Sequence, residues 1–251
     1  MAWLLIDNSN TRTKLALGDE HGLSEWRAVV RTADLARASL EKSLEGLRFE
    51  GVVCASVVPE KAKLLEDFFK PGTPFHLLTH QSPHELGFDL DHPEQIGSDR
   101  LANAIALRGK HGVPGIAVDF GTAVTFSVVS AEGNFCGGAI APGMAAMTDY
   151  LSSRTAQLPL IEPVEPSTAI GKTTVDAMRT GAVIGHRGMV GEILRALIAE
   201  AGGKPKVVAT GGGAAFAAPH IKEIGVVDTD LTLEGLRLLA GRVFPDSGFD
   251  R

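Results

Sequence analysis

An apolar segment runs into a polar one at Trp3-Leu4-Leu5-Ile6-Asp7-Asn8-Ser9-Asn10-Thr11. The apolar part is long enough for a short buried strand. Asp, Asn and Ser favour the turn that follows, because their side chains hydrogen-bond to nearby backbone groups. Residues 13–17 are again mostly apolar. The stretch therefore predicts a β-hairpin with Asp7 at the end of its first strand.

The same pattern returns near the middle of the chain. Residues 116–118 are apolar and run into Asp119-Phe120-Gly121-Thr122-Ala123, after which residues 124–129 form another apolar segment. Almost half of the 251 residues separate the two aspartates. An internal repeat of this kind indicates a duplicated domain. We therefore expect two related halves, residues 1–112 and 113–251.

Strand and helix patterns alternate around these hairpins. Further strands are predicted at 26–30, 51–55, 75–78, 134–140, 206–209 and 224–227, and helices at 33–47, 60–69, 98–111, 173–201 and 233–242, with others beginning near 142 and after 213. Residues 79–96 are expected to be irregular, and a loop of that length is usually functional. The order predicts an α/β fold in which each half is a mixed sheet flanked by helices.

The predicted helix 173–201 contains three glycines, Gly181, Gly185 and Gly188. Each costs about 1 kcal/mol relative to alanine inside a helix. Such glycines indicate close packing, either within one chain or against a second copy of it.

Composition narrows the class of protein. The net charge is −6 without any Lys/Arg run, which argues against a nucleic-acid partner. No apolar stretch is long enough for a membrane span, and the first apolar segment meets Asp7 too early for a signal peptide. Cys54 and Cys136 form no Cys-x-x-Cys motif, so neither a disulfide framework nor a zinc ribbon is expected. We expect a soluble cytosolic protein that binds no membrane.

The repeated aspartates favour phosphate chemistry. A lone aspartate at the end of a strand is more often a turn cap, but its recurrence at equivalent places favours a functional role. Exposed backbone N–H groups in such turns bind phosphate oxygens, and paired carboxylates suit the metal ions used in phosphoryl transfer. Lys14 could reach the β- or γ-phosphate of a nucleotide.

A third acidic residue stands at a predicted helix start, Gly97-Ser98-Asp99-Arg100. The free N–H groups and the dipole of a helix N-terminus favour an anion there. Asp99 could simply complement that dipole. Beside phosphate-binding turns, it is also placed to act as a general base on an acceptor hydroxyl, and Arg100 suits a carboxylate on that acceptor.

Three other motifs give weaker evidence about function. Gly211-Gly212-Gly213 is either a tight turn or a close approach to a ligand, and NAD binding is a weak alternative because Phe216 replaces the third glycine. Gly171-Lys172-Thr173 is no P-loop, since Pro166 stands where the first glycine belongs. His76, His80 and His84 are more readily loop histidines than metal ligands.

Six motifs taken together resemble type III pantothenate kinases, bacterial enzymes of the acetate and sugar kinase, Hsp70 and actin superfamily. They are Asp7-Asn8-Ser9-Asn10-Thr11 with Lys14; Gly97-Ser98-Asp99-Arg100; Asp119-Phe120-Gly121-Thr122-Ala123; Gly137-Gly138-Ala139-Ile140-Ala141-Pro142-Gly143; Gly171-Lys172-Thr173-Thr174; and Asp230-Leu231-Thr232-Leu233-Glu234-Gly235-Leu236. The resemblance implies two ribonuclease H-like (actin-like ATPase) domains with the active site in the cleft between them. It also implies ATP-dependent phosphorylation of pantothenate to 4′-phosphopantothenate, the first step toward coenzyme A.

The resemblance also implies roles for single residues. Asp99 would be the catalytic base, Asp7 would hold Mg²⁺ through water, and Asp119 would bind a monovalent cation, K⁺ or NH₄⁺. Thr174 would contact pantothenate near the subunit interface of a homodimer. The implied ATP-binding residues are Asp7, Asn8, Ser9, Asn10, Thr11, Arg12, Thr13, Lys14 and Thr122, and the implied pantothenate-binding residues are Leu90, Gly97, Ser98, Asp99, Arg100 and Thr174.

Two positions depart from the family pattern. Ser9 stands where the family has glycine, which costs about 1 kcal/mol if the turn requires a positive φ. Leu90 stands where the family commonly has a tyrosine that contacts the substrate. Two alternatives therefore stay open: a kinase for another small hydroxy acid, and a catalytically weak regulatory relative.

Overall fold

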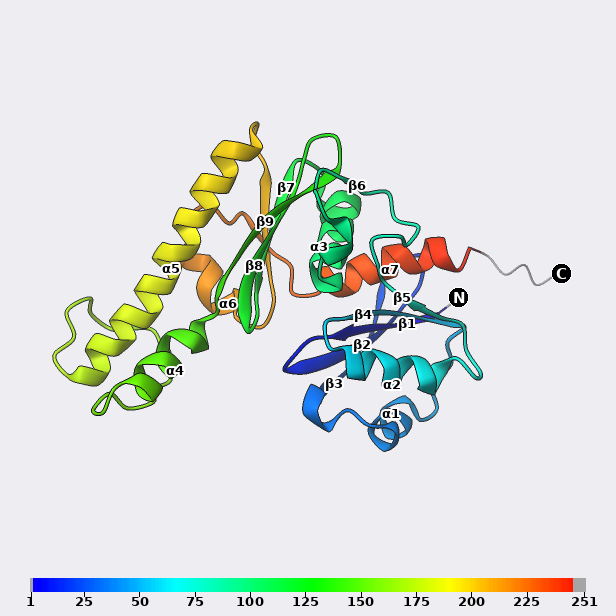
Figure 1. The fold of residues 1–251 in the computed structure, drawn as a ribbon, viewed down its shortest axis with the longest axis horizontal. Coiled ribbons are helices and arrows are strands. Elements are labelled where there is room, and N and C mark those ends of the chain that lie inside the picture. Colours follow the sequence, from blue (N-terminus) through cyan, green and yellow to red (C-terminus); the bar gives the residue numbers. More distant parts are fainter. Residues whose placement is uncertain (1, 246–251) are drawn as a thin grey trace.

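The computed structural model describes residues 2–245 and contains two mixed β-sheets with helices around and between them (Figure 1). The strands are β1 Trp3–Asn8, β2 Arg12–Gly18, β3 Leu23–Arg31, β4 Gly51–Ser56, β5 Phe75–Leu77, β6 Gly87–Phe88, β7 Gly115–Phe120, β8 Ala123–Val129, β9 Asn134–Pro142, β10 Lys206–Thr210 and β11 Val226–Val227. The helices are α1 Arg37–Leu44, α2 Pro59–Phe69, α3 Ser98–Ala106, α4 Met144–Arg154, α5 Thr174–Ala201, α6 Ala214–Ala217 and α7 Leu231–Val243. None of these helices combines the length and hydrophobicity that a membrane span needs.

The two sheets repeat one arrangement. The first has the strand order β3-β2-β1-β4-β5 and the second β11-β10-β7-β8-β9-β6. In each, the strand that carries the aspartate pairs antiparallel with the next strand of its hairpin and parallel with a later strand: β1 lies between β2 and β4, and β7 lies between β8 and β10. The predicted duplicated α/β fold is confirmed.

Each sheet also receives an element from the other half of the sequence. Strand β6, inside the stretch predicted to be irregular, pairs with β9 and so extends the second sheet. Helix α7, near the end of the chain, packs against β1 and β4 of the first sheet. The boundary between residues 112 and 113 stays a prediction.

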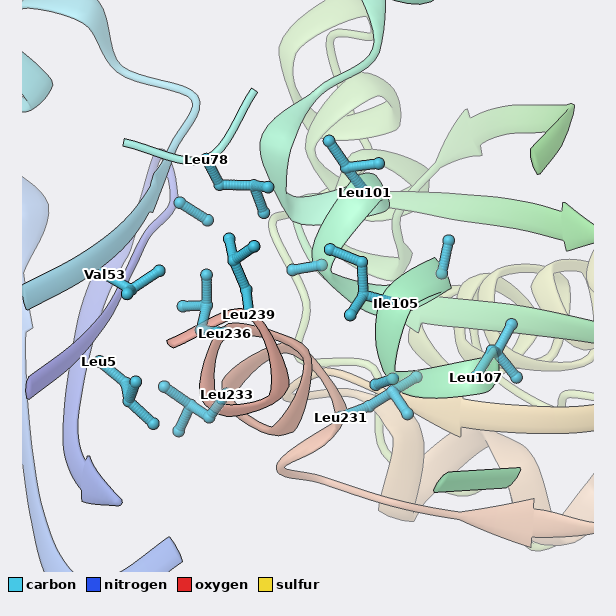
Figure 2. Close-up of a cluster of buried hydrophobic side chains, with 14 of the residues drawn as sticks. Leu5, Val53, Leu78, Leu101, Ile105, Leu107, Leu231, Leu233, Leu236 and Leu239 are labelled. Carbon is cyan, nitrogen blue, oxygen red and sulfur yellow. The ribbon is translucent and has the colours of Figure 1, made fainter. Parts of the chain in front are cut away.

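The largest buried cluster lies between the sheets, where α3 and α7 pack side by side (Figure 2). In Figure 2, Leu5 of the first sheet lies beside Leu233 of α7, and Leu101 and Ile105 of α3 lie on the far side of the same cluster. Burying one leucine side chain contributes about 1.5–3 kcal/mol. This α3–α7 pair therefore holds the two sheets, and the hairpins they carry, in a fixed relation.

One predicted helix is much shorter than its pattern indicates. Residues 33–47 were expected to be helical, but α1 spans only Arg37–Leu44. Leu35 is fully buried in the cluster below the first sheet, and the extended backbone there inserts its side chain. At the other end Gly46 has a φ of 76°, which terminates the helix.

Helix α5 begins as predicted, because the Thr173 side chain accepts a hydrogen bond from the Asp176 backbone N–H at 3.1 Å. A methyl group added at Gly181, Gly185 or Gly188 would meet no atom within 4 Å among residues 2–245. Packing within the chain therefore does not explain these glycines.

Candidate active site

A cavity of about 310 Å³ lies where the two hairpins face each other. It is lined by Asp7, Ser9, Thr11, Arg12, Lys14, Asp119, Phe120, Gly121, Thr122 and Gly211–Gly213. Both halves of the duplicated fold thus contribute to one cleft. The glycine turn after β10, for which the sequence left two explanations open, forms part of its wall.

The first hairpin supplies a carboxylate together with an ammonium group. Asp7 and Lys14 are cross-strand partners on β1 and β2, and Lys14 Nζ lies 3.8 Å from Asp7 Oδ2. The Ser9 hydroxyl donates to Asp7 Oδ1 at 3.1 Å. Burial raises the pKa of Asp7, although Lys14 and Ser9 oppose this shift.

Ser9 fits this turn without strain. Among residues 2–245 only glycines have a positive φ, so the conditional cost of a serine here does not arise. The turn closes through the Ser9 N–H, which donates to the Arg12 carbonyl at 3.1 Å. Ser9 thus gains a hydrogen bond to Asp7 that glycine could not make.

Some of the predicted ATP-binding residues lie outside the cavity lining. Asn8 and Thr13 are buried, and the Asn8 amide donates to the Thr13 hydroxyl at 2.7 Å. The Ser56 hydroxyl donates to Asn8 Oδ1 at 2.6 Å, which ties the hairpin to β4. Asn10 is exposed at the tip of the turn.

The second hairpin carries its aspartate differently. The cross-strand partner of Asp119 is Thr125, and Asp119 takes part in no ion pair within 4 Å among residues 2–245. Instead, Asn103 Nδ2 donates to Asp119 Oδ2 at 3.2 Å. Burial raises the pKa of Asp119 to about 6; the charges of Asp7 and Asp99 act in the same direction, and Asn103 and Lys14 oppose them.

The tips of the two hairpins touch across the cleft. The hydroxyls of Thr11 and Thr122 form a hydrogen bond at 3.0 Å. These two threonines lie at equivalent places in the repeat. Their hydroxyls therefore face the same part of the cleft.

The third carboxylate stands beside the cavity, at the first turn of α3. Asp99 Oδ1 accepts from the Arg100 backbone N–H at 2.8 Å, and the Ser98 hydroxyl donates to the Ser56 carbonyl at 3.0 Å. A Cβ at Gly97 would lie 2.6 Å from Asp99 Oδ1, so a larger residue there would shift this carboxylate. The charge of Asp99 contributes to raising the pKa of both Asp7 and Asp119. All three carboxylates therefore belong to one electrostatic site.

Arg100 points toward the second sheet. Its Nη2 donates to the Phe126 carbonyl at 3.3 Å, and its guanidinium lies 5.4 Å from the Phe135 ring centroid. Burial lowers its pKa. Its Nε is buried without a hydrogen-bond partner among residues 2–245. The guanidinium is a group suited to binding an anion, although its Nε is closed off from solvent here.

Leu90 and Thr174, the two remaining predicted substrate residues, lie apart from each other. Leu90 is half-buried against the core between the sheets, and one of its methyl groups faces Gly137. Thr174 is exposed at the first residue of α5, at the outer end of the arm that α4 and α5 form, away from α3 (Figure 1). Within a single chain, Thr174 therefore lies far from Asp99 and Arg100 on α3.

His76 lies in β5 and His84 in the loop that follows, and both make local contacts. His76 Nε2 lies 2.8 Å from the Ser82 hydroxyl, and the His84 ring packs edge-on against Phe88. Within residues 2–245, no group of three or more His, Cys, Asp or Glu side chains is arranged to hold a metal ion.

Asn103 is a residue of this site that no sequence motif predicted. It lies four residues after Asp99, so the two share one face of α3. That spacing was the available signal, but only the fold shows that this face meets β7.

Comparisons with known proteins show the family to which this chain is similar. The sequence model of the type III pantothenate kinase family matches residues 3–196. The type III pantothenate kinase of Akkermansia muciniphila is 48% identical over 241 residues, covering 96% of this chain and 99% of the relative. That of Moorella thermoacetica is 39% identical over 250 residues, covering 95% and 98%.

Two solved structures share the fold at low sequence identity. The (R)-2-hydroxyglutaryl-CoA dehydratase component A of Acidaminococcus fermentans has a TM-score of 0.58 at 13% identity, covering 98% of this chain and 100% of that chain. The ROK hexokinase of Thermus thermophilus has a TM-score of 0.54 at 15% identity, with the same coverage. The fold, the cleft between the repeated hairpins and the full-length relatives agree: this chain belongs to the type III pantothenate kinase family.

Proposed function

We propose that this protein transfers the γ-phosphoryl group of ATP to the hydroxyl of pantothenate, which forms 4′-phosphopantothenate at the start of coenzyme A synthesis. The observation that carries the proposal is one cleft into which each half of the fold brings a strand-ending aspartate, with Asp99 beside it. Family membership identifies the activity, and the geometry suggests which residues perform it.

The two hairpin turns bind the phosphates of ATP in this proposal. Their backbone N–H groups and the hydroxyls of Thr11 and Thr122 replace the phosphate's water shell. The hydrogen bond between these two hydroxyls would be exchanged for bonds to phosphate oxygens. Lys14, half-exposed and beside Asp7, places a positive charge on the same phosphates.

The donor set fits cations that share their coordination with substrate. Asp7 and Asp119 offer hard carboxylate oxygens, and too few further ligands stand near them in residues 2–245 for an all-protein metal site. Mg²⁺ commonly takes one or two carboxylates together with waters and phosphate oxygens. Asp7 would hold Mg²⁺ through water, and Asp119 would hold K⁺ or NH₄⁺. Such cations neutralise charge that develops during phosphoryl transfer.

Asp99 takes the proton from the pantothenate hydroxyl in this proposal. Its carboxylate is partly exposed, next to the cleft and fixed by the Arg100 N–H. Gly97 and Ser98 shape the same turn, Arg100 would pair with the pantothenate carboxylate, and Leu90 would add an apolar wall. The hydroxyl then attacks the γ-phosphorus as its proton passes to Asp99, while the bond from the γ-phosphorus to the β,γ-bridging oxygen breaks and ADP leaves.

A homodimer would complete the acceptor site. Thr174 is too far along the α4–α5 arm to reach α3 of its own chain (Figure 1). The arm also exposes Tyr150, Ile170 and Ile184, which are 66%, 72% and 45% exposed. A hollow of about 670 Å³ between α4 and α5 is lined mainly by apolar atoms. Apolar surface of this kind marks protein–protein contacts, and the open glycines of α5 would let a second helix approach.

The deciding experiment measures ATP consumption by the purified protein with pantothenate and with a panel of other small hydroxy acids, each with and without K⁺. We expect turnover with pantothenate that K⁺ increases. Turnover with another hydroxy acid alone would identify a different acceptor, for which Leu90 would be the first residue to test. Hydrolysis independent of any acceptor would favour the regulatory relative, and sedimentation of the same sample tests the dimer. A cytosolic location stays a prediction.

A further inference from the structure

A chain of buried polar side chains connects helix α7 to the aspartate of the second hairpin. The Thr232 hydroxyl donates to Asn103 Oδ1 at 2.8 Å, and Asn103 Nδ2 donates to Asp119 Oδ2 at 3.2 Å. Thr232 is 5% exposed and Asn103 is 1% exposed, so water does not compete for these bonds.

The direction of the chain is chemically determined. An ionised carboxylate only accepts hydrogen bonds, whereas the asparagine amide has one accepting end and one donating end. If the Asn103 amide turned over, its carbonyl oxygen would face the oxygen of Asp119. A hydroxyl donor at Thr232 holds the carbonyl end and so keeps the N–H end directed at Asp119.

The opposite oxygen of Asp119 is confined as well. A Cβ at Gly211 would collide with Asp119 Oδ1, and Gly211 has a φ of 87°, which favours glycine. The backbone after β10 therefore lies directly against this carboxylate. Asp119 is held by Asn103 on one side and bounded by Gly211 on the other.

Helix α3 carries both Asp99, the proposed base, and Asn103, the hydrogen-bond partner of Asp119. Asp99 and Asn103 are one helical turn apart on it. The helix is itself fixed against α7, where Gly235 has no side chain because the Ala102 carbonyl occupies that space. The same α3–α7 contact thus sets the places of Asp99 and of the partner of Asp119.

We propose that Thr232 and Asn103 are positioning residues, which hold the Asp119 carboxylate toward the nucleotide and keep it in register with Asp99 on the same helix. The inference rests on the proposed function, since it assigns Asp119 to the ATP side of the reaction. Neither residue touches the cleft, so each acts through Asp119.

The test compares Thr232→Val with Thr232→Ser. Valine keeps the shape of threonine but removes the hydroxyl, while serine keeps the hydroxyl. The readout is calorimetric binding of the β,γ-imido analogue of ATP with Mg²⁺ and K⁺ in the absence of pantothenate, together with both KM values. We expect Thr232→Val to weaken analogue binding about fivefold, which is the net effect of losing one hydrogen bond. Thr232→Ser should bind within about twofold of wild type, and the pantothenate KM should not change.

A purely structural role predicts otherwise. If Thr232→Val lowers the melting temperature while binding the analogue as tightly as Thr232→Ser, the positioning role is overturned. Equal weakening by valine and serine overturns it too, because the hydroxyl would then be irrelevant. Should Thr232→Val fail to fold, Thr232→Ala removes the same hydroxyl without a second methyl group and takes its place. Wild-type protein that binds the analogue but does not phosphorylate pantothenate would refute the proposed function alone, because the binding comparison remains measurable.

Discussion

The two hairpins share a backbone and differ in charge. In β1–β2 the residue opposite the aspartate is Lys14, whereas in β7–β8 the residue at the same register is Thr125. On their other sides both aspartates pair with a parallel strand, Asp7 with Ala55 and Asp119 with Thr210. The two halves therefore share the hairpin and its aspartate, and differ in the residue that stands opposite the carboxylate.

In the proposed function, this difference would give the two hairpins different needs for a cation. Asp7 has an ammonium group 3.8 Å away, while the neighbour of Asp119 is the neutral amide of Asn103. A buried carboxylate without a cationic partner is costly, which is why burial raises the pKa of Asp119 to about 6. A mobile monovalent cation at Asp119 would supply the charge that Lys14 supplies in the first hairpin.

The largest effect on turnover should come from replacing Asp99, the carboxylate that belongs to neither hairpin. Asp99→Asn removes the proposed base, and we expect kcat to fall about 10³-fold, within the range of general-base catalysis. Binding of the β,γ-imido ATP analogue should stay within about twofold, because the hairpins are untouched. Steady-state kinetics and calorimetry check both. Turnover near that of wild type would reject Asp99 as the base.

The next effect separates the two hairpins directly. Lys14→Met removes the cation of the first hairpin, and we expect kcat/KM for ATP to fall about 10²-fold through lost phosphate stabilisation. Thr125→Val, at the equivalent register, should change kcat/KM less than about threefold, because no charge is lost there. Similar losses in the two variants would show that the hairpins are not differentiated by charge.

A lysine in the second hairpin should make it resemble the first. Thr125→Lys places a lysine opposite Asp119, as Lys14 stands opposite Asp7. The Cβ atoms of such cross-strand partners are about 5 Å apart. We expect activation by K⁺ to fall below about twofold, because the ammonium group occupies the place of the ion. The control is Thr125→Met, which has similar length and no charge. Unchanged K⁺ activation in Thr125→Lys would place the cation elsewhere.

The smallest effect is on stability and depends on pH. The folded protein binds a proton at Asp119 more tightly than the unfolded chain does, because its pKa is raised from 3.8 to about 6. The free energy of unfolding therefore falls as pH rises through this interval. Asp119→Asn removes the charge, and we expect it to stabilise the unliganded protein by about 1–2 kcal/mol near pH 7.5, less than the full pKa shift corresponds to, because Asp119 lines a cleft that solvent can enter. The gain should vanish below about pH 4, where the wild-type carboxyl is protonated in both states.

Urea unfolding at the two pH values, without nucleotide or K⁺, measures this gain. The matched variant Asp7→Asn should gain less, because it also deprives Lys14 of its partner. A loss of stability in Asp119→Asn near neutral pH would contradict the unpaired state of Asp119.

The sequence by itself determined the repeat and its chemistry. Apolar residues that end in Asp7 and Asp119, each followed by turn residues and a second strand, indicated two hairpins, and the helix start at Gly97 placed Asp99. These signals are local, because strand alternation, turn preference and helix initiation depend on neighbours in the chain. The family resemblance rested on the same segments and is confirmed by relatives over the full length.

Only the tertiary structure decided which of these residues meet. Asn103 reaches Asp119 because α3 crosses to the second sheet, and Thr232 reaches Asn103 because α7 packs on α3. Strand β6 likewise joined the second sheet by pairing with β9, far from it in sequence. Contacts between distant segments depend on how buried surfaces fit together, and a buried asparagine has no sequence pattern that names its partner. The sequence therefore indicated which charged residues form the site, and tertiary packing determined how they are positioned.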